Sequence, residues 1–388
     1  MVPRLSSGTR MVLLACLTVA IGILRARYLP SVDVAEYHRY AEAFVTRPMG
    51  THWPREYPAL AMGLFLLPML LPVSYPLGWA LVTAGLLVSL LIYGGRIEGP
   101  AWVTRFLIFL DLGAIYLWAS RYDLWPAACL WLTLLAAERK RWGSAWGWMA
   151  LGTALKWFPM VLAPLVLIDE WRTTGRWRWD RLFVFLGVTA LLLFGLPALT
   201  NPSQALSPIQ YSWRRPTEIE STVAGLLAWV HPSVHLIRSF GSLNVQSTMA
   251  NHGLGLGFLL LGVGLEVLVW KGWAAGRWSW TEAAILAVGI LIITSKVYSA
   301  QYWIWMVPLV ARSSPRFSVG WTVVAALTTA VYPFSWLAVH WVTGWTWTDV
   351  MRLAGIRDVL LAWGLWRTAQ GARTSEPQTP PLPTSLSS

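Results

Sequence analysis

Apolar stretches close to the length of a membrane-spanning helix recur along almost the whole of this 388-residue chain. A helix needs about 20 mostly apolar residues to cross a bilayer. Hydrophobic residues make up 56% of the sequence and charged residues 12%; about 25% of a typical soluble domain is charged. A soluble core cannot bury so much apolar sequence. We therefore predict an all-α, polytopic membrane protein with one transmembrane domain over residues 1–366.

The apolar pattern predicts twelve spans and places both termini in the cytoplasm. An interrupted stretch at 58–73, which contains Pro68 and Pro72, is interpreted as interfacial or re-entrant. This count leaves the basic clusters between the spans on the cytoplasmic side, as the positive-inside rule expects. The predicted spans are residues 11–24, 77–94, 101–119, 125–137, 143–155, 159–168, 182–199, 253–270, 279–294, 302–311, 317–338 and 348–366.

Outside these spans the chain is polar in three places. Loops 25–57 and 200–252 are predicted to be extracytoplasmic, and they contain most of the polar residues that the topology does not explain. Residues 367–388 are predicted to form a cytoplasmic tail, disordered from residue 372 because Ser, Thr and Pro dominate it. Juxtamembrane amphipathic helices are expected in the loops.

The charge and the cysteines exclude several classes of protein. The formal charge of +12 comes from Lys and Arg clusters between apolar stretches, which points to lipid head groups and not to nucleic acid. Cys16 and Cys129 lie far apart in apolar sequence and predict neither a disulfide framework nor a thiolate metal site. Interfacial belts are the expected place for Trp171, Trp177, Trp179, Trp270, Trp273 and Trp278.

The first external loop contains the strongest candidate for a catalytic group. Tyr37, Tyr40 and Phe44 fall at helical spacing, which predicts an amphipathic helix on the membrane surface. Asp33 precedes this helix and has Glu36 three residues later, the pattern of an N-cap with a capping box. Its carboxylate is also suited to take the proton from an acceptor hydroxyl. The two roles are compatible.

Several basic residues lie on the predicted external side, where positive charge is usually sparse. They suit a phosphate leaving group, and snorkelling to lipid head groups is the equally good alternative for each. Lys156 and Lys296 stand out because each interrupts apolar sequence. The full set is Arg55, Arg121, Lys156, Arg214, Arg215 and Lys296.

Acidic residues near these cations have open interpretations. Glu56 after Arg55, and Asp123 after Arg121, form local ion pairs or belong to an acceptor pocket. Glu218 and Glu220 are predicted to lie on a solvated helix face in the second loop. The six histidines lack zinc-ligand spacing, and neither a phosphate-binding Gly-rich loop nor a dinucleotide fingerprint is present. We expect no cofactor and a metal-independent mechanism.

Four segments together resemble a known superfamily. They are Asp33 with the aromatic helix after it, REYPAL at 55–60, LKWFPMVLAP at 155–164 and SKVYSAQYWIWMVPL at 295–309. Their order resembles the GT-C superfamily of polytopic glycosyltransferases, and most closely glycosyltransferase family 87, the bacterial polyprenyl-phosphate-mannose-dependent mannosyltransferases. The last segment also looks like the late motif of the eukaryotic enzyme that adds the first mannose to the GPI anchor.

This resemblance implies an inverting transfer of a hexose from a polyprenyl-phosphate donor. It maps the catalytic acid of the family onto Asp33, and the Lys and Gln of the late motif onto Lys296 and Gln301. The chain departs from the GPI-type enzymes at Ala35, where they carry a second Asp, so a metal-dependent role of this loop is not expected. The usual double proline is reduced to Tyr57-Pro58-Ala59.

The resulting hypothesis is a multi-pass glycosyltransferase of the cell membrane, with its site facing the extracytoplasmic side and a lipid or glycan as acceptor. Asp33 is the predicted base, and Lys296, Arg55, Lys156 and Arg121 are the predicted phosphate ligands. The predicted substrate-binding residues are Glu56, Tyr57, Tyr37, His38, Asp123, Tyr298 and Gln301. The alternatives are a lipid-linked sugar carrier or flippase without chemistry, for which we find no repeated halves, and a receptor or structural membrane protein.

Overall fold

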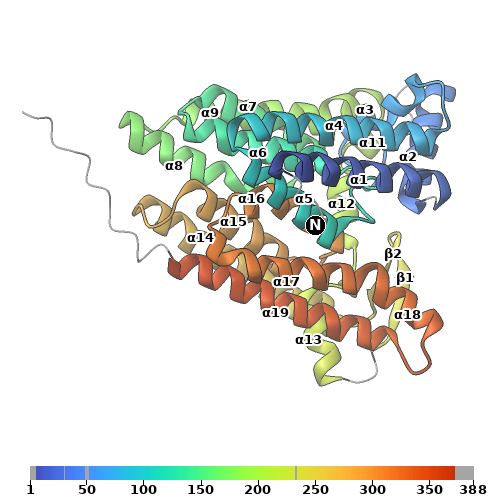
Figure 1. Cartoon of the computed structure of the whole chain (residues 1–388). Helices are drawn as coiled ribbons and strands as arrows, with labels where there is room; N and C mark the ends of the chain where they lie inside the picture. The colour runs from blue at the N-terminus through green and yellow to red at the C-terminus, as the bar shows by residue number, and fades with distance from the viewer. Residues whose placement is uncertain (1–5, 30, 49–51, 232–233, 372–388) are drawn as a thin grey trace, which may run out of the picture.

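The computed structural model describes residues 6–29, 31–48, 52–231 and 234–371, and most of these residues are helical. The predicted all-α fold is confirmed, and the chain is a multi-pass membrane protein. Most long helices run side by side, and short elements such as α2 and the β1–β2 hairpin gather at one end, on the right of Figure 1.

The first half of the chain consists of α1 (Ser7–Tyr28), α2 (Val32–Thr46), α3 (Ala61–Leu66), η1 (Leu67–Leu70), α4 (Tyr75–Ile97), α5 (Pro100–Ala114), α6 (Leu124–Glu138), α7 (Trp142–Leu155), η2 (Phe158–Leu162), α8 (Ala163–Thr174) and α9 (Trp179–Ala190). The π-helical turn η3 (Leu191–Gly195) and α10 (Leu196–Thr200) continue α9.

The second half consists of α11 (Pro202–Ala205), α12 (Ser207–Arg214), α13 (Thr222–Val230), β1 (Leu236–Ser239), β2 (Ser242–Val245), η4 (Met249–Leu254), α14 (Gly255–Ala274), α15 (Trp280–Thr294), η5 (Ala300–Tyr302), α16 (Trp303–Val310), η6 (Pro315–Phe317), α17 (Ser318–Thr329), η7 (Ala330–Ser335), α18 (Trp336–Trp341) and α19 (Trp347–Gly371). The strands β1 and β2 form an antiparallel hairpin.

The predicted spans fall on mainly helical sequence, except that the span at 101–119 runs past the end of α5 at Ala114 into the following turn. Within the described residues, five helices are long and apolar enough to cross a bilayer: 8–28, 75–97, 179–200, 249–274 and 315–341. The interrupted stretch at 58–73 forms a helix over 61–70, too short for a full span. The number of spans stays a prediction. Helix α19 continues to Gly371, past the predicted domain end, and residues 372–388 lie outside the described part.

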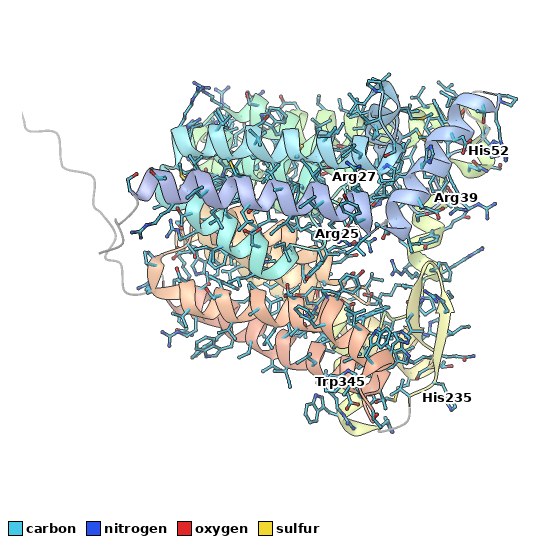
Figure 2. The ribbon with its side chains drawn as sticks, turned by 45° about the vertical axis from the view of Figure 1, so that its right-hand side comes forward. Arg25, Arg27, Arg39, His52, His235 and Trp345 are labelled. Atoms are coloured by element: carbon cyan, nitrogen blue, oxygen red, sulfur yellow. The ribbon has the colours of Figure 1, made fainter. Side chains whose placement is uncertain are left out.

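Ion pairs join the loops that were predicted to be cytoplasmic, so these loops share one end of the bundle. Arg312 pairs with Glu98 and Glu138 at 3.1 and 2.8 Å, and Lys140 pairs with Asp169 at 2.8 Å. At the opposite end, Figure 2 shows Arg25, Arg39, His52, His235 and Trp345 together. The loops predicted to be cytoplasmic and the loops predicted to be external therefore lie at opposite ends of the bundle. Which side of the membrane each end faces stays a prediction.

The second long loop is more structured than its polar sequence suggests. Helix α13 begins after Ser221, whose hydroxyl accepts a hydrogen bond from the Ala224 amide. It packs against α19, where a Cβ on Gly225 would lie 2.7 Å from the Cα of Gly355. The two glycines therefore allow the backbones to approach closely, and α13 is fixed to the bundle.

Many tryptophans lie inside the bundle, contrary to a purely interfacial role. Trp171, Trp177 and Trp179 are exposed and stack on one another, as expected for a belt. Trp273 is buried, and its indole donates to the Leu165 carbonyl at 3.0 Å. Indole rings fill notches at glycines: a Cβ on Gly94 would lie 2.1 Å from Trp102. Small residues let bulky rings pack closely between membrane helices.

Candidate active site

Three consecutive residues, Arg121, Tyr122 and Asp123, organise the candidate site. They lie in the turn between α5 and α6, and Asp123 is the residue before the first residue of α6. Tyr122 and Asp123 are almost completely buried. Because the chain turns here, the three side chains meet different partners. Arg121 contacts α2, Tyr122 contacts Tyr57 in the loop before α3, and Asp123 contacts Lys156 at the end of α7.

Arg121 forms an ion pair with Asp33, in which its Nη1 donates to Oδ1 of the carboxylate. Of the two interpretations left open for Asp123, a local ion pair with Arg121 is therefore excluded. The capping role of Asp33 is also wrong, since α2 begins after Ser31 and Asp33 is inside its first turn. Both partners of the pair keep about a fifth of their side chains exposed. Asp33 is thus held in place and still accessible.

Asp123 pairs with Lys156, the residue that ends α7. The Lys156 Nζ lies 2.6 Å from Oδ1 of Asp123, and the Trp305 indole donates to the same oxygen at 2.6 Å. The Lys156 Nζ also lies 4.9 to 5.4 Å from the ring centroids of Tyr122, Tyr302 and Trp305. Aromatic faces stabilise a partly desolvated cation.

Aromatic rings connect the two ion pairs. Tyr37 stacks on Phe65 and meets Tyr57 and Tyr122 edge-on, with centroids 5.6 and 6.0 Å away. These rings hold α2, α3 and the turn at Tyr122 together. The structure therefore brings six predicted site residues into one group: Asp33, Tyr37, Tyr57, Arg121, Asp123 and Lys156.

Other predicted residues lie next to this group. Glu56 accepts a hydrogen bond from the Tyr40 hydroxyl at 2.7 Å, so its predicted local pair with Arg55 is replaced by a contact with α2. His38 is exposed and stacks on Tyr75. Arg55 lines an open hollow of about 560 Å³ along the outer side of α2. The hollow's lining includes Glu36, Arg39, Tyr40, Arg47, Arg55 and Gln204.

The late segment 295–301 approaches the site from the other half of the chain. The Lys296 Nζ donates to the Trp213 carbonyl at 2.8 Å, and burial together with the charge of Arg215 lowers the pKa of this lysine. Tyr298 is buried and stacks on Tyr302 at 6.2 Å. The Gln301 Oε1 is buried and has no hydrogen-bond partner among the described residues.

The prediction that Glu218 and Glu220 form a solvated helix face is wrong, because both are buried before α13 begins. The Glu220 carboxylate accepts from the Ala300 amide at 2.8 Å. Backbone pairing with the β1–β2 hairpin, where the Ile219 amide donates to the Leu243 carbonyl, covers this segment. Burial and the neighbouring Glu220 raise the pKa of Glu218 to about 8.

Sequence reasoning missed three further residues at this end. Trp305 is a direct partner of Asp123, although it reads as one apolar residue in a span. Arg25 lies in the last turn of α1 and over the Tyr116 ring at 5.9 Å, close enough to Asp33 and Arg121 to interact with their charges. Arg357 is fully buried in α19. A charged residue inside an apolar span was the signal available for Arg357.

Chemically, the group offers a fixed carboxylate beside several cations. A guanidinium carries five N–H donors, so Arg121 can hold Asp33 and a phosphate oxygen at once. Within the described ranges, no cluster of His, Cys, Asp and Glu could hold a metal ion. Metal independence stays a prediction.

Comparison with known proteins adds a likeness of fold. No protein-family model matches the chain, and a search of curated proteins gave no match. The chain is similar to the crystal structure of ArnT from Cupriavidus metallidurans in the apo state, with 14% identity, a TM-score of 0.49 and coverage of 94% of this chain and 78% of that one. The same protein bound to undecaprenyl phosphate gives a TM-score of 0.47 with equal identity and coverage. With TM-scores below 0.5, the function proposed below rests on the site.

Removing one partner of the Lys156–Asp123 pair should destabilise the protein strongly. Lys156→Met leaves a buried carboxylate without its cation, which costs about 3–5 kcal/mol. The double variant Lys156→Met/Asp123→Asn should recover much of this loss because neither charge remains. Thermal unfolding in nanodiscs measures both. Arg178→Met, which removes an exposed pair with Asp180, is the control and should cause no measurable change. Equal stability of Lys156→Met and wild type would contradict the pairing.

The stability of the second loop should fall as the pH rises towards 8. Glu218 has a pKa of about 8 in the folded protein and an ordinary pKa near 4.5 when unfolded. Between these values the folded state keeps a proton that the unfolded state has released, so this stabilisation is present below pH 4.5 and is lost through pH 8. Thermal unfolding of wild type and Glu218→Gln from pH 5 to 9 tests this. The wild-type curve should fall more steeply; parallel curves would refute the raised pKa.

Proposed function

We propose that this protein is a membrane glycosyltransferase that moves a sugar from a polyprenyl-phosphate donor to an acceptor hydroxyl. The observation that carries the proposal is the group at Arg121–Asp123, where a fixed, accessible carboxylate lies beside two cations contributed by distant segments. A base and a phosphate-holding site are the two parts that such a transfer needs.

In the proposed reaction, Asp33 takes the proton from the acceptor hydroxyl. The hydroxyl oxygen then forms a bond to the anomeric carbon of the donor sugar, while the bond from that carbon to the phosphate oxygen breaks. The electron pair of the broken bond goes to the phosphate, which leaves with its polyprenyl chain. A single displacement of this kind inverts the anomeric centre.

Arg121 and Lys156 are proposed to stabilise the charge that develops on the leaving phosphate. Arg121 can present a bidentate fork and Lys156 a point charge. We propose that Lys296, from the late segment, and Arg25, from the last turn of α1, add further positive charge. In this proposal the polyprenyl chain remains in the lipid while its phosphate reaches these cations.

The finer assignments are part of this proposal. The sequence resemblance to glycosyltransferase family 87 supports a hexose, and specifically mannose, as the transferred sugar. The same resemblance supports membership of the GT-C superfamily and an active site on the extracytoplasmic side. The alternative, a lipid-linked sugar carrier, would also use buried cations to hold a phosphate. It gives no role to the accessible carboxylate of Asp33, which favours the enzyme.

The hollow along α2 is the proposed entry for the acceptor. Its residue Glu36 lies three positions after Asp33 on the same helix, about 4.5 Å along the axis at 1.5 Å per residue. Guanidinium, carboxylate and amide groups line it, which suits a glycan or lipid head group rich in hydroxyls. Its volume falls within the range of about 300–1,000 Å³ common for small-molecule sites.

Substituting Asp33 should abolish transfer and leave donor binding intact. Asp33→Asn keeps the shape of the side chain and removes its basicity, so turnover should fall by about 10²–10⁴-fold. The assay uses the protein in nanodiscs with radiolabelled polyprenyl-phosphate-mannose and a crude lipid acceptor extract. Asp180→Asn, at an exposed acidic residue outside the site, should keep wild-type turnover. Donor binding without product in wild type, across several polyprenyl sugars, would favour the carrier instead.

Removing a charge from the hollow should weaken acceptor use selectively. A hydrogen bond to a charged group contributes about 1.5–3 kcal/mol, so Arg47→Gln should raise the acceptor KM by about tenfold or more. The donor KM should stay unchanged. Arg27→Gln is the matched control, since Arg27 lies at the end of α1 and contacts the Tyr28 ring. Equal acceptor KM values for the two variants would exclude the hollow as the acceptor site.

A further inference from the structure

A buried charged cluster lies outside the ion pairs of the site, between α19 and the loop that precedes α13. Arg357 and Asp358 are both fully buried on α19, and the Arg357 Nε donates to the Asp358 carboxylate at 2.8 Å. The Arg357 Nη2 donates to the Glu220 carbonyl at 2.6 Å. Thr222 completes the cluster, with its hydroxyl 3.0 Å from Oδ2 of Asp358.

This cluster holds the segment 295–301 at three points. The Ala300 amide donates to the Glu220 carboxylate at 2.8 Å, and the Glu218 amide donates to the Lys296 carbonyl at 2.9 Å. Between these two hydrogen bonds, the Arg357 guanidinium lies 3.8 Å from the centroid of the Tyr298 ring. The backbone around Lys296 is therefore fixed by groups from two other parts of the chain.

Stacked rings lead from this segment to the candidate site. Tyr298 stacks on Tyr302, and Tyr302 stacks on Trp305 with centroids 3.9 Å apart. Trp305 donates to Asp123, and both Tyr302 and Trp305 flank the Lys156 ammonium. A displacement of Tyr298 would therefore reach Lys156 through rings in direct contact.

Fold stability alone is a weak reason for this cluster. A buried ionic group can often be replaced by apolar side chains of similar volume with little loss, because removing charges from water is costly. Helices α13 and α19 are already joined by the close contact of Gly225 with Gly355. The charged groups also orient the loops, since Arg357 donates to the Glu220 carbonyl and the Glu220 carboxylate accepts from the Ala300 amide.

We propose that Arg357 and Glu220 are positioning residues that hold segment 295–301 and, through the stacked rings of Tyr298 and Tyr302, keep the Lys156 ammonium in position for the donor phosphate. This inference rests on the proposed function. It assigns no contact with substrate to either residue. Arg357 acts through Tyr298 and through the backbone of Glu220, and Glu220 acts through the Ala300 amide.

Hydrogen exchange measured by mass spectrometry, on the full chain in nanodiscs, tests the positioning without any enzyme assay. In Glu220→Ala the Ala300 amide loses its acceptor, and in Arg357→Met the Tyr298 ring and the Glu220 backbone lose the group that holds them. Amides of segment 295–301 should therefore exchange about tenfold faster or more in both variants. Glu220→Gln keeps an oxygen for the Ala300 amide and should restore protection. Arg312→Met removes a comparable charge from the opposite end and should leave this segment unchanged.

The kinetic arm measures the donor and acceptor KM of the same variants, with Arg357→Lys as a substitute if Arg357→Met does not fold. Faster exchange with a raised donor KM and an unchanged acceptor KM supports the proposal. Unchanged exchange overturns it, as does faster exchange with an unchanged donor KM. If wild type shows no transfer at all while the variants exchange faster, the segment is held as described and the proposed function fails.

Discussion

The buried pair of Lys156 with Asp123 is the constraint on which the candidate site depends. Two charges removed from water are tolerated when they satisfy each other and their remaining hydrogen bonds. Here the Asp123 oxygen also accepts from Trp305, and three aromatic rings surround the ammonium. Since Lys156 ends α7, Asp123 precedes α6 and Trp305 lies in α16, this one pair fixes three helices relative to one another.

The neighbouring residues of the same turn extend this arrangement to α2. Arg121 fixes the first turn of α2 through Asp33, and Tyr122 packs against the rings of α2. Charged groups are expensive within a bilayer, so a helical membrane protein gathers them at the ends of its helices or buries them in pairs. The site contains one pair of each kind: Lys156–Asp123 is the more buried pair, and Arg121–Asp33 is the more accessible one. Such a gradient of exposure suits a donor whose phosphate is polar and whose chain is apolar.

The sequence predicted the helices well and the contacts between distant segments poorly. The apolar run at 77–94 became α4, and the proline-interrupted stretch at 58–73 became a short helix, because length and composition decide both. The grouping of Asp33, Arg121 and Lys156 was predicted as a set, but their partners were not. A local pair of Arg121 with Asp123 was one of two interpretations left open, and the turn between α5 and α6 points the two side chains to different helices.

The burial of Glu218 and Glu220 could not be predicted for a related reason. Polar sequence around two carboxylates normally indicates a solvated loop, and their covering comes from the β1–β2 hairpin and from Arg357, far away in the sequence. In the same way, the buried partners of Trp305 and Arg357 depend on how α16 and α19 pack. Spacing within one segment does not report such contacts.

The most direct test of the account is a cryo-electron microscopy structure of the protein in nanodiscs with a polyprenyl phosphate bound. We predict density for the phosphate within hydrogen-bonding distance of the Arg121 guanidinium and the Lys156 ammonium, with the chain leading into the lipid and room for the donor sugar between the phosphate and the Asp33 carboxylate. A phosphate bound elsewhere, with the Arg121–Asp33 and Lys156–Asp123 pairs untouched, would contradict the proposed site.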